Sequence, residues 1–147
     1  MSLPKLTADE LHRLLASEFP QMFRAEGGLS IERVEQGGCR VRQAFRPDTL
    51  RPGGTISGVA MMSLADVTMY IAVLAAVGWV PLAVTTNLSI NFLRKPGPRD
   101  LLGECRLLKL GKRLAVGEVT IFSDGMEEPV AHATTTYSIP QEVDSRW

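Results

Sequence analysis

The sequence is poor in the residue types that often identify a function at once. Only two cysteines and two histidines occur among 147 residues. Cys39 and Cys105 lie far apart in the chain without the spacing of zinc ligands, so we expect neither a metal site nor a disulfide framework. Net charge is also absent, because 16 basic and 16 acidic side chains balance. This balance argues against a protein built to bind nucleic acid, which needs a basic surface.

The chain does have the length and apolar content of one folded domain. Hydrophobic residues make up 45% of the 147 residues, so we expect a single domain over residues 1–147. The segment from Leu3 to Glu10 is polar and mixed in charge, unlike a signal peptide. We therefore expect a cytoplasmic protein.

The first part of the chain predicts a helix and a hairpin. Thr7 and Glu10 have the spacing of a capping box, and leucines at helical spacing predict a helix over residues 8–23, regular to about Glu18 and continued by a looser turn through Phe23. Two short runs within residues 31–45 flank a Gly-Gly pair, which is typical of a β-hairpin. A loop rich in proline and glycine follows over residues 46–55.

Residues 56–77 form the one long apolar segment. Its methionine, alanine and leucine content favours a helix, and its apolar residues surround the axis, which predicts burial on most sides. The segment is also long enough to resemble a membrane span. Asp66 lies in its middle, where a charge in lipid is costly, so we favour a buried helix and expect no membrane contact.

The second half predicts strands. Apolar and polar residues alternate strictly from Leu82 to Phe92, and further strands separated by turn residues continue to Ile139. Successive strands with tight turns form an antiparallel sheet within residues 82–139. Because a helix that is apolar all round needs wrapping, we expect an α+β fold with a curved antiparallel sheet around the central helix.

Asp66 is the first candidate for chemistry. No Lys or Arg lies within four positions, so no partner on the same helix neutralises its charge. One interpretation is a structural carboxylate bonded to Tyr70, Ser63 or strand residues, and the other is a desolvated carboxylate kept for reactivity. Burial alone does not identify a reaction, so these residues leave both interpretations open.

The start of the central helix is the second candidate. Ser57 is a plausible N-cap, and the amide of Gly58 then has no partner within the helix and can hold a carbonyl oxygen that gains charge. The alternative is a simple helix cap. Gly58 and Asp66 are separated by roughly 12 Å along a helix. If both act on one carbonyl group, two chains related by a twofold axis must share each site.

These residues carry a resemblance to a known family. Ser57-Gly58 followed by Leu64-Ala65-Asp66 resembles the core motif of hotdog-fold acyl-CoA thioesterases of the PaaI-like, phenylacetic acid degradation branch. The similarity extends from about Phe45 to Ile139. Its later segments are Val84-Thr85, Asn91 to Arg94, Gly111 to Arg113, and Val130 to Thr134.

The resemblance implies a hotdog fold, assembled as a homodimer and often as a dimer of dimers. It implies hydrolysis of acyl-CoA to free acid and CoA, with no metal and no other cofactor. Asp66 is then the nucleophile or the general base, and the Gly58 amide binds the thioester oxygen. Thr85 helps to place the water or the carboxylate, and Ser57 either substitutes as a weak donor beside Gly58 or only caps the helix.

The sequence departs from the family pattern in this motif. The usual His-Gly-Gly is here Ser57-Gly58-Val59, and Arg51 stands where Asn is often found. An alternative is therefore a protein that binds acyl-CoA or acyl carrier protein without turnover. A hotdog dehydratase or hydratase is a third interpretation, which we disfavour because such enzymes usually pair an acid with a histidine. His12 and His132 are both distant from the motif.

The remaining candidates concern the substrate. Coenzyme A carries phosphates, which favour Arg and Lys, although basic residues at strand ends also protect sheet edges. The acyl group is left open by the sequence, because apolar residues on a buried helix fit a pocket or a plain core. The substrate-binding candidates are Arg94, Lys95, Lys112, Arg113, Asn91 and Tyr70.

Overall fold

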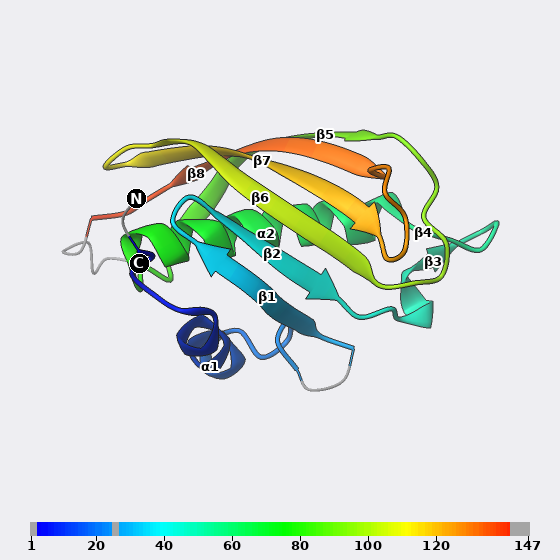
Figure 1. Ribbon diagram of the computed structural model, residues 1–147, viewed down its shortest axis with the longest axis horizontal. Helices are drawn as coiled ribbons and strands as arrows, with labels where there is room; N and C mark the ends of the chain where they lie inside the picture. Colours follow the sequence, from blue (N-terminus) through cyan, green and yellow to red (C-terminus); the bar gives the residue numbers. More distant parts are fainter. Residues whose placement is uncertain (1–2, 25–26, 142–147) are drawn as a thin grey trace.

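A six-stranded antiparallel sheet curves around one long helix in the computed structural model, which describes residues 3–24 and 27–141 (Figure 1). The elements in chain order are α1 (Ala8–Glu18), β1 (Leu29–Glu35), β2 (Gly38–Gln43), a 3-10 turn (Pro47–Thr49), β3 (Leu50–Arg51), β4 (Thr55–Ile56), α2 (Gly58–Val77), β5 (Val84–Phe92), β6 (Leu101–Leu110), β7 (Leu114–Ser123) and β8 (Ala131–Ser138).

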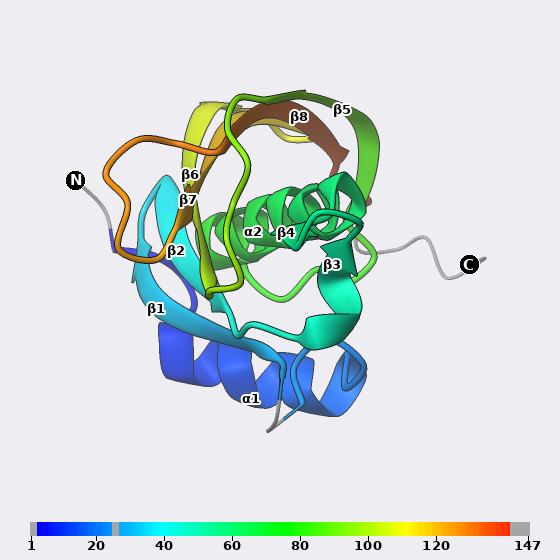
Figure 2. The ribbon, with the colours of Figure 1, turned by 90° about the vertical axis from the view of Figure 1, so that its right-hand side faces the viewer.

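The order of strands in the large sheet is β1-β2-β6-β7-β8-β5, with all neighbours antiparallel. Figure 2 shows the sheet curving over α2, with α1 below β1 and with β5 at the opposite edge of the sheet. The expected α+β architecture, a curved sheet around a central helix, is therefore present. Because β5 has only one partner strand within residues 3–24 and 27–141, its outer side is an edge that a further strand can pair with.

The helix lies very close to the sheet because two strand positions lack side chains. A Cβ on Gly103 would lie 2.6 Å from Oγ1 of Thr68, and one on Gly117 would lie 2.7 Å from Sδ of Met69. Both glycines therefore permit a close approach that fixes the depth of α2. Of the most apolar 18-residue window of α2, 72% is buried. This packing explains the apolar composition of the helix.

The element boundaries differ from the sequence prediction at several places, among them the start of β1, which lies at Leu29 rather than at residue 31. Helix α1 ends at Glu18, and the looser turn expected through Phe23 follows it, because Phe19 precedes Pro20 and leaves the helical region with φ −136° and ψ 54°. Helix α2 begins at Gly58 rather than at residue 56. Within the predicted loop over residues 46–55, the chain forms strand β3 and the start of β4, which pair with each other.

The two cysteines are distant in sequence but directly opposed in the sheet. Cys39 on β2 pairs in register with Cys105 on β6, and both are buried free thiols. Burial raises the pKa of Cys105 to about 12 and raises that of Cys39 well above its ordinary range. The Cys39 thiol also donates to the carbonyl oxygen of Thr68 at 3.2 Å.

We expect both thiols to be unreactive in the native protein. At pH 8 an aromatic disulfide reagent should titrate no thiol in the folded chain and two thiols in denaturant. The unfolded chain loses its thiol protons near pH 8.5 while the folded chain keeps them. The free energy of unfolding should therefore fall as the pH rises above about 8.5. Rapid titration of either thiol in the native protein would contradict this burial.

Candidate active site

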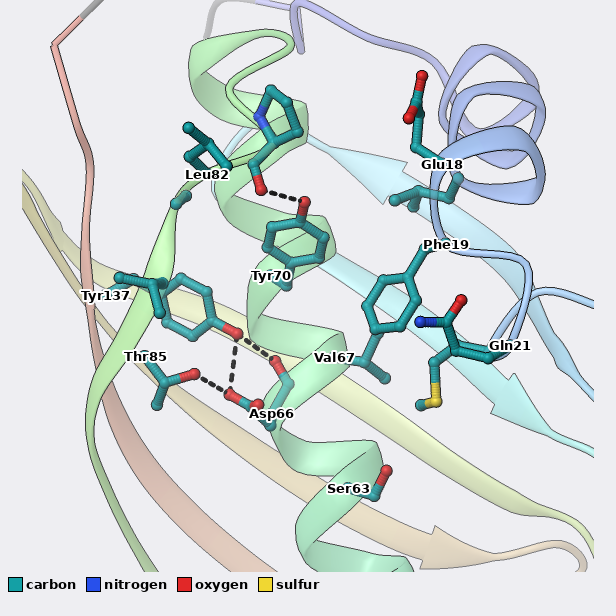
Figure 3. A pocket seen from close by; sticks show the side chains of 15 residues that line it. Glu18, Phe19, Gln21, Ser63, Asp66, Val67, Tyr70, Leu82, Thr85 and Tyr137 are labelled. Carbon is teal, nitrogen blue, oxygen red and sulfur yellow. Dashed lines mark hydrogen bonds between the residues drawn. The ribbon is translucent and has the colours of Figure 1, made fainter. Parts of the chain in front are cut away.

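The side chain of Asp66 lines a pocket of about 640 Å³ (Figure 3). This pocket lies on the side of α2 that the sheet does not cover. Ser63, Asp66, Val67 and Tyr70 line this pocket from one face of the helix, as expected for residues three and four positions apart. The Asp66 side chain is neither fully buried nor fully exposed. Its carboxylate is therefore accessible to a ligand in the pocket.

Two hydroxyl groups hold the Asp66 carboxylate. Thr85 Oγ1 donates a hydrogen bond to Oδ1, and the Tyr137 hydroxyl lies 2.8 Å from the same oxygen (Figure 3). The Tyr137 hydroxyl is also 3.0 Å from the main-chain oxygen of Asp66. Burial raises the pKa of Tyr137 above its usual range, and the Asp66 carboxylate raises it further. Tyr137 is therefore a neutral donor at physiological pH.

A β-bulge aims Thr85 at the carboxylate. Thr85 pairs with Tyr137 and Asn87 pairs with Thr136, so Thr86 is an extra residue in β5. The bulge shifts the phase of the alternation, and Thr85 then faces α2 together with Leu88, which packs against the core. Strict alternation from the core-facing Leu88 would instead have turned Thr86 inward and Thr85 away from Asp66.

The chain near α1 forms a wall of the pocket that the sequence did not predict. Leu15, Glu18, Phe19, Gln21 and Met22 all line it. The rings of Phe19, Tyr70 and Tyr137 form a row, with centroid separations of 6.4 Å and 6.1 Å. Leucines at helical spacing indicate that α1 buries one face, but this local pattern does not say what that face covers.

Tyr137 is a further site residue that was not predicted from the sequence. It ends the inward-facing set of β8, whose other members are the small residues Ala131, Ala133 and Thr135. A single large aromatic residue at the end of an alternating set of small residues can be recognised in the sequence. Only the pairing of β8 with β5 shows that this ring reaches Asp66.

Gly58 lies in a different pocket of the same chain. This second pocket measures about 370 Å³ and includes Arg51, Phe92, Arg94 and Lys95. Ser57 caps α2, and its Oγ accepts a hydrogen bond from the amide of Ala60 at 3.2 Å. The structure therefore brings Gly58 together with two of the predicted phosphate-binding residues, and Asp66 together with Thr85, but the two groups do not share a pocket.

The other two basic candidates are separate from these. Lys112 and Arg113 lie in the turn between β6 and β7, and neither lines the pocket of Asp66 or that of Gly58. Arg94 is partly engaged, because its guanidinium lies 2.6 Å from Glu128 and donates to the carbonyl oxygen of Pro129 at 2.7 Å. Lys95 is exposed beside it.

The remaining candidates have distinct surroundings. The Tyr70 hydroxyl donates to the carbonyl oxygen of Pro81 at 2.7 Å rather than to Asp66. Asn91 is exposed on β5 and pairs with His132 across the sheet. Nε2 of His132 lies 3.1 Å from Glu118 on the outer face of the sheet, and His12 is an exposed residue of α1. Neither histidine lines the pocket of Asp66.

This geometry can support proton transfer or nucleophilic attack by a carboxylate. Both hydroxyl donors meet Oδ1 of Asp66, and Oδ2 accepts no hydrogen bond from the part of the chain that the structure describes. A carboxylate with one fixed oxygen and one free oxygen, beside an apolar pocket, can take a proton from water or attack an ester-like carbon.

Comparison with known proteins gives a consistent result. The family model for the Thioesterase superfamily matches residues 53–130. A protein from Saccharolobus solfataricus, provisionally described as an esterase, is 32% identical over 144 residues, which span 97% of this chain and 91% of that protein.

Solved structures agree with the sequence comparison. A crystal structure from Silicibacter sp. TM1040, provisionally described as a thioesterase, is 50% identical with a TM-score of 0.84 and covers 96% of each chain. A mutant of the phenylacetic acid degradation protein PaaI from Thermus thermophilus is 25% identical with a TM-score of 0.69, covering 80% of this chain and 98% of that one.

Proposed function

Because this chain belongs to the thioesterase superfamily and has the hotdog fold expected from its sequence, we propose that it hydrolyses acyl-CoA thioesters. The observation that carries the proposal is the carboxylate of Asp66, fixed by two hydroxyl groups at the wall of a largely apolar pocket. Such a site can accommodate an acyl chain and present a base or nucleophile to its thioester carbon.

The reaction converts acyl-CoA and water into a carboxylic acid and a thiol. With Asp66 as general base, its carboxylate takes a proton from water while the water oxygen bonds to the thioester carbon. The carbonyl oxygen gains a negative charge, which the Gly58 amide stabilises. The C–S bond then breaks, and the thiolate takes the proton from Asp66. With Asp66 as nucleophile, its oxygen bonds to the thioester carbon and the C–S bond breaks, which gives an acyl-aspartyl anhydride and the CoA thiolate. Water then hydrolyses the anhydride to the free acid and regenerates the Asp66 carboxylate, and the proton released from water passes to the thiolate.

We infer that each active site is shared between two chains. Gly58 and Asp66 stand roughly 12 Å apart along α2 and line different pockets of one chain. A twofold axis beside β5 would bring Gly58 of one copy toward Asp66 of the other. The β5 edge supports this pairing, since it has a free side in the described part of the chain and exposes Val84 and Phe92.

The pocket of Gly58 suits the phosphate end of the substrate. Arg51, Arg94 and Lys95 line this pocket together with Gly58 and give it a positive charge, which suits the phosphates of CoA. Arg51 is an addition to the residues predicted from the sequence for this role. Lys112 and Arg113 do not line this pocket, so they would contact the same CoA molecule only from the partner subunit.

An aromatic acyl group fits the pocket of Asp66 best. Phe19, Tyr70 and Tyr137 supply a row of rings, and aromatic pairs at such separations gain energy beyond area burial. The structural relative from Thermus thermophilus is named for phenylacetic acid degradation, which supports the same class. The preferred substrate would therefore be an arylacyl-CoA.

Phe19→Ala should raise KM for arylacyl-CoA by about 3- to 10-fold, because one aromatic contact contributes roughly 0.5–1.5 kcal/mol. The value of kcat should change less, since Phe19 lies away from the carboxylate. Phe122→Ala is the matched control, because Phe122 alternates with buried residues of β7 and faces outward from the sheet. Equal effects of the two substitutions on KM would contradict this placement of the acyl group.

The decisive test is a thiol-release assay with a panel of acyl-CoA substrates. The panel should include acetyl, medium-chain, benzoyl and phenylacetyl thioesters, with thermal unfolding followed in parallel. Thiol release from at least one member supports hydrolysis. The non-catalytic alternative, which Ser57 in place of the family histidine favours, predicts a higher Tm with CoA esters but no thiol release.

A further inference from the structure

We propose that Tyr137 is a positioning residue that holds Oδ1 of Asp66 and leaves Oδ2 as the oxygen that reacts. The inference rests on the proposed hydrolase function and assigns a role within that site to a residue outside the family-matched range of 53–130. Its basis is the pattern of hydrogen bonds around one carboxylate.

The two hydroxyl donors converge on the same oxygen. Tyr137 lies 2.8 Å from Oδ1, and Thr85 donates to Oδ1 as well. They come from adjacent strands, in positions that pair directly, so the sheet fixes one relative to the other. A carboxylate that is gripped at one oxygen by two donors has a defined plane, and its second oxygen has a defined direction.

Tyr137 is held more firmly than Thr85. Its side chain is only 3% exposed, and its ring packs against Tyr70 at 6.1 Å. Its hydroxyl also contacts the main-chain oxygen of Asp66 at 3.0 Å. The phenol therefore contacts both the backbone and the side chain of Asp66, which limits rotation of the carboxylate relative to α2.

The protonation state suits this role. A buried phenol next to a carboxylate stays neutral, because an anionic phenolate would be desolvated and repelled by Asp66. Tyr137 therefore remains a donor through the working range of pH and does not itself take a proton from water. In the general-base step, Oδ2 takes that proton, and the same proton later passes to the departing thiolate.

The contacts predict two consequences of Tyr137→Phe. Without this donor the carboxylate loses its fixed orientation, and kcat should fall by about 10- to 100-fold, the effect of losing a hydrogen bond to a charged group. The carboxylate also binds its proton more readily when a donor is removed. The acid limb of the pH profile of kcat/KM should therefore move to higher pH.

Tyr70→Phe is a matched control. It removes the same hydroxyl group from the same pocket, but that hydroxyl donates to the carbonyl oxygen of Pro81 and not to Asp66. Tyr70→Phe should therefore leave the acid limb where it is in the wild type, whatever its effect on KM. Thr85→Val provides a second comparison, because it removes the other donor to Oδ1 and should shift the acid limb in the same direction as Tyr137→Phe.

A second readout does not depend on turnover. With ¹³C-labelled aspartate, the carboxyl resonance of Asp66 at a fixed pH should move in Tyr137→Phe, which removes a hydrogen bond to it, and stay in place in Tyr70→Phe. An active wild type, together with an unmoved acid limb and an unmoved Asp66 resonance in Tyr137→Phe, would overturn the role of Tyr137 alone. Equal shifts in both tyrosine variants would overturn it as well. Absence of thiol release by the wild type would instead overturn the proposed function.

Discussion

Asp66→Asn should slow thiol release from the best acyl-CoA substrate by about 10²- to 10⁴-fold, the usual contribution of a positioned acid or base. Asparagine keeps the shape of the side chain and an oxygen that can accept from Thr85 and Tyr137, but it has no charge and no basic oxygen. The substitution therefore removes the chemistry and keeps the hydrogen bonds that hold the residue in place. Initial rates of thiol release, with protein concentration matched, measure the effect.

Two further variants make the result interpretable. Asp124→Asn removes a carboxylate that pairs with Arg42 at 3.1 Å, outside the pocket of Asp66, and should retain the wild-type rate. Asp66→Ala removes the side-chain acceptor shared by Thr85 and Tyr137 and leaves the Tyr137 hydroxyl only the main-chain oxygen of Asp66, so it should lower stability by about 1–3 kcal/mol in addition to losing activity. Wild-type rates in folded Asp66→Asn would refute both the nucleophile and the general-base mechanism.

Mixing two inactive chains should restore activity if each site is shared. Asp66→Asn lacks the carboxylate, and Gly58→Val places a branched side chain before the oxyanion amide, which should lower the rate by about 10²- to 10³-fold. In a hybrid dimer of these chains, one site has both substitutions and the other has neither. Random mixing should therefore yield about a quarter of the wild-type specific activity.

The arrangement of the substitutions provides the control. When both are placed in one chain and this chain is mixed with wild type, each site of the hybrid carries one substitution and the hybrid should be inactive. Hybrids isolated with two different affinity tags, then assayed for thiol release, distinguish the cases. A Cβ at position 58 would lie 3.1 Å from the exposed ring of Phe92, which can move aside, so the fold should tolerate the change. An inactive hybrid of the two single variants would place Gly58 and Asp66 in separate functions.

The local sequence pattern was sufficient to predict the architecture. An apolar helix without a polar face needs covering on all sides, and antiparallel strands with tight turns can supply that cover. Asp66 stood out for the same reason, because it is the only ionised side chain in that helix. The resemblance then supplied the fold family, which the comparisons confirmed.

Helix ends and strand phase were less accessible from the sequence. The apolar run from residue 56 predicts helix at once, whereas Thr55 and Ile56 pair with β3 and α2 begins at Gly58. The alternation from Leu82 to Phe92 predicted a regular strand, whereas the structure has a bulge at Thr86. Local alternation does not contain this information, because a bulge depends on which residue of the partner strand each residue meets.

The sequence by itself therefore determined the central helix and the antiparallel sheet and singled out Asp66 as the catalytic candidate, since all three follow from local periodicity and charge. Only the tertiary structure decided what surrounds that carboxylate. Thr85 contacts it because of a bulge in β5, and Tyr137 contacts it from a position 71 residues further along the chain. Phe19, which precedes the first strand of the sheet in the chain, lines the same pocket. These contacts join distant segments, and their geometry is set by strand pairing and helix packing rather than by any local pattern.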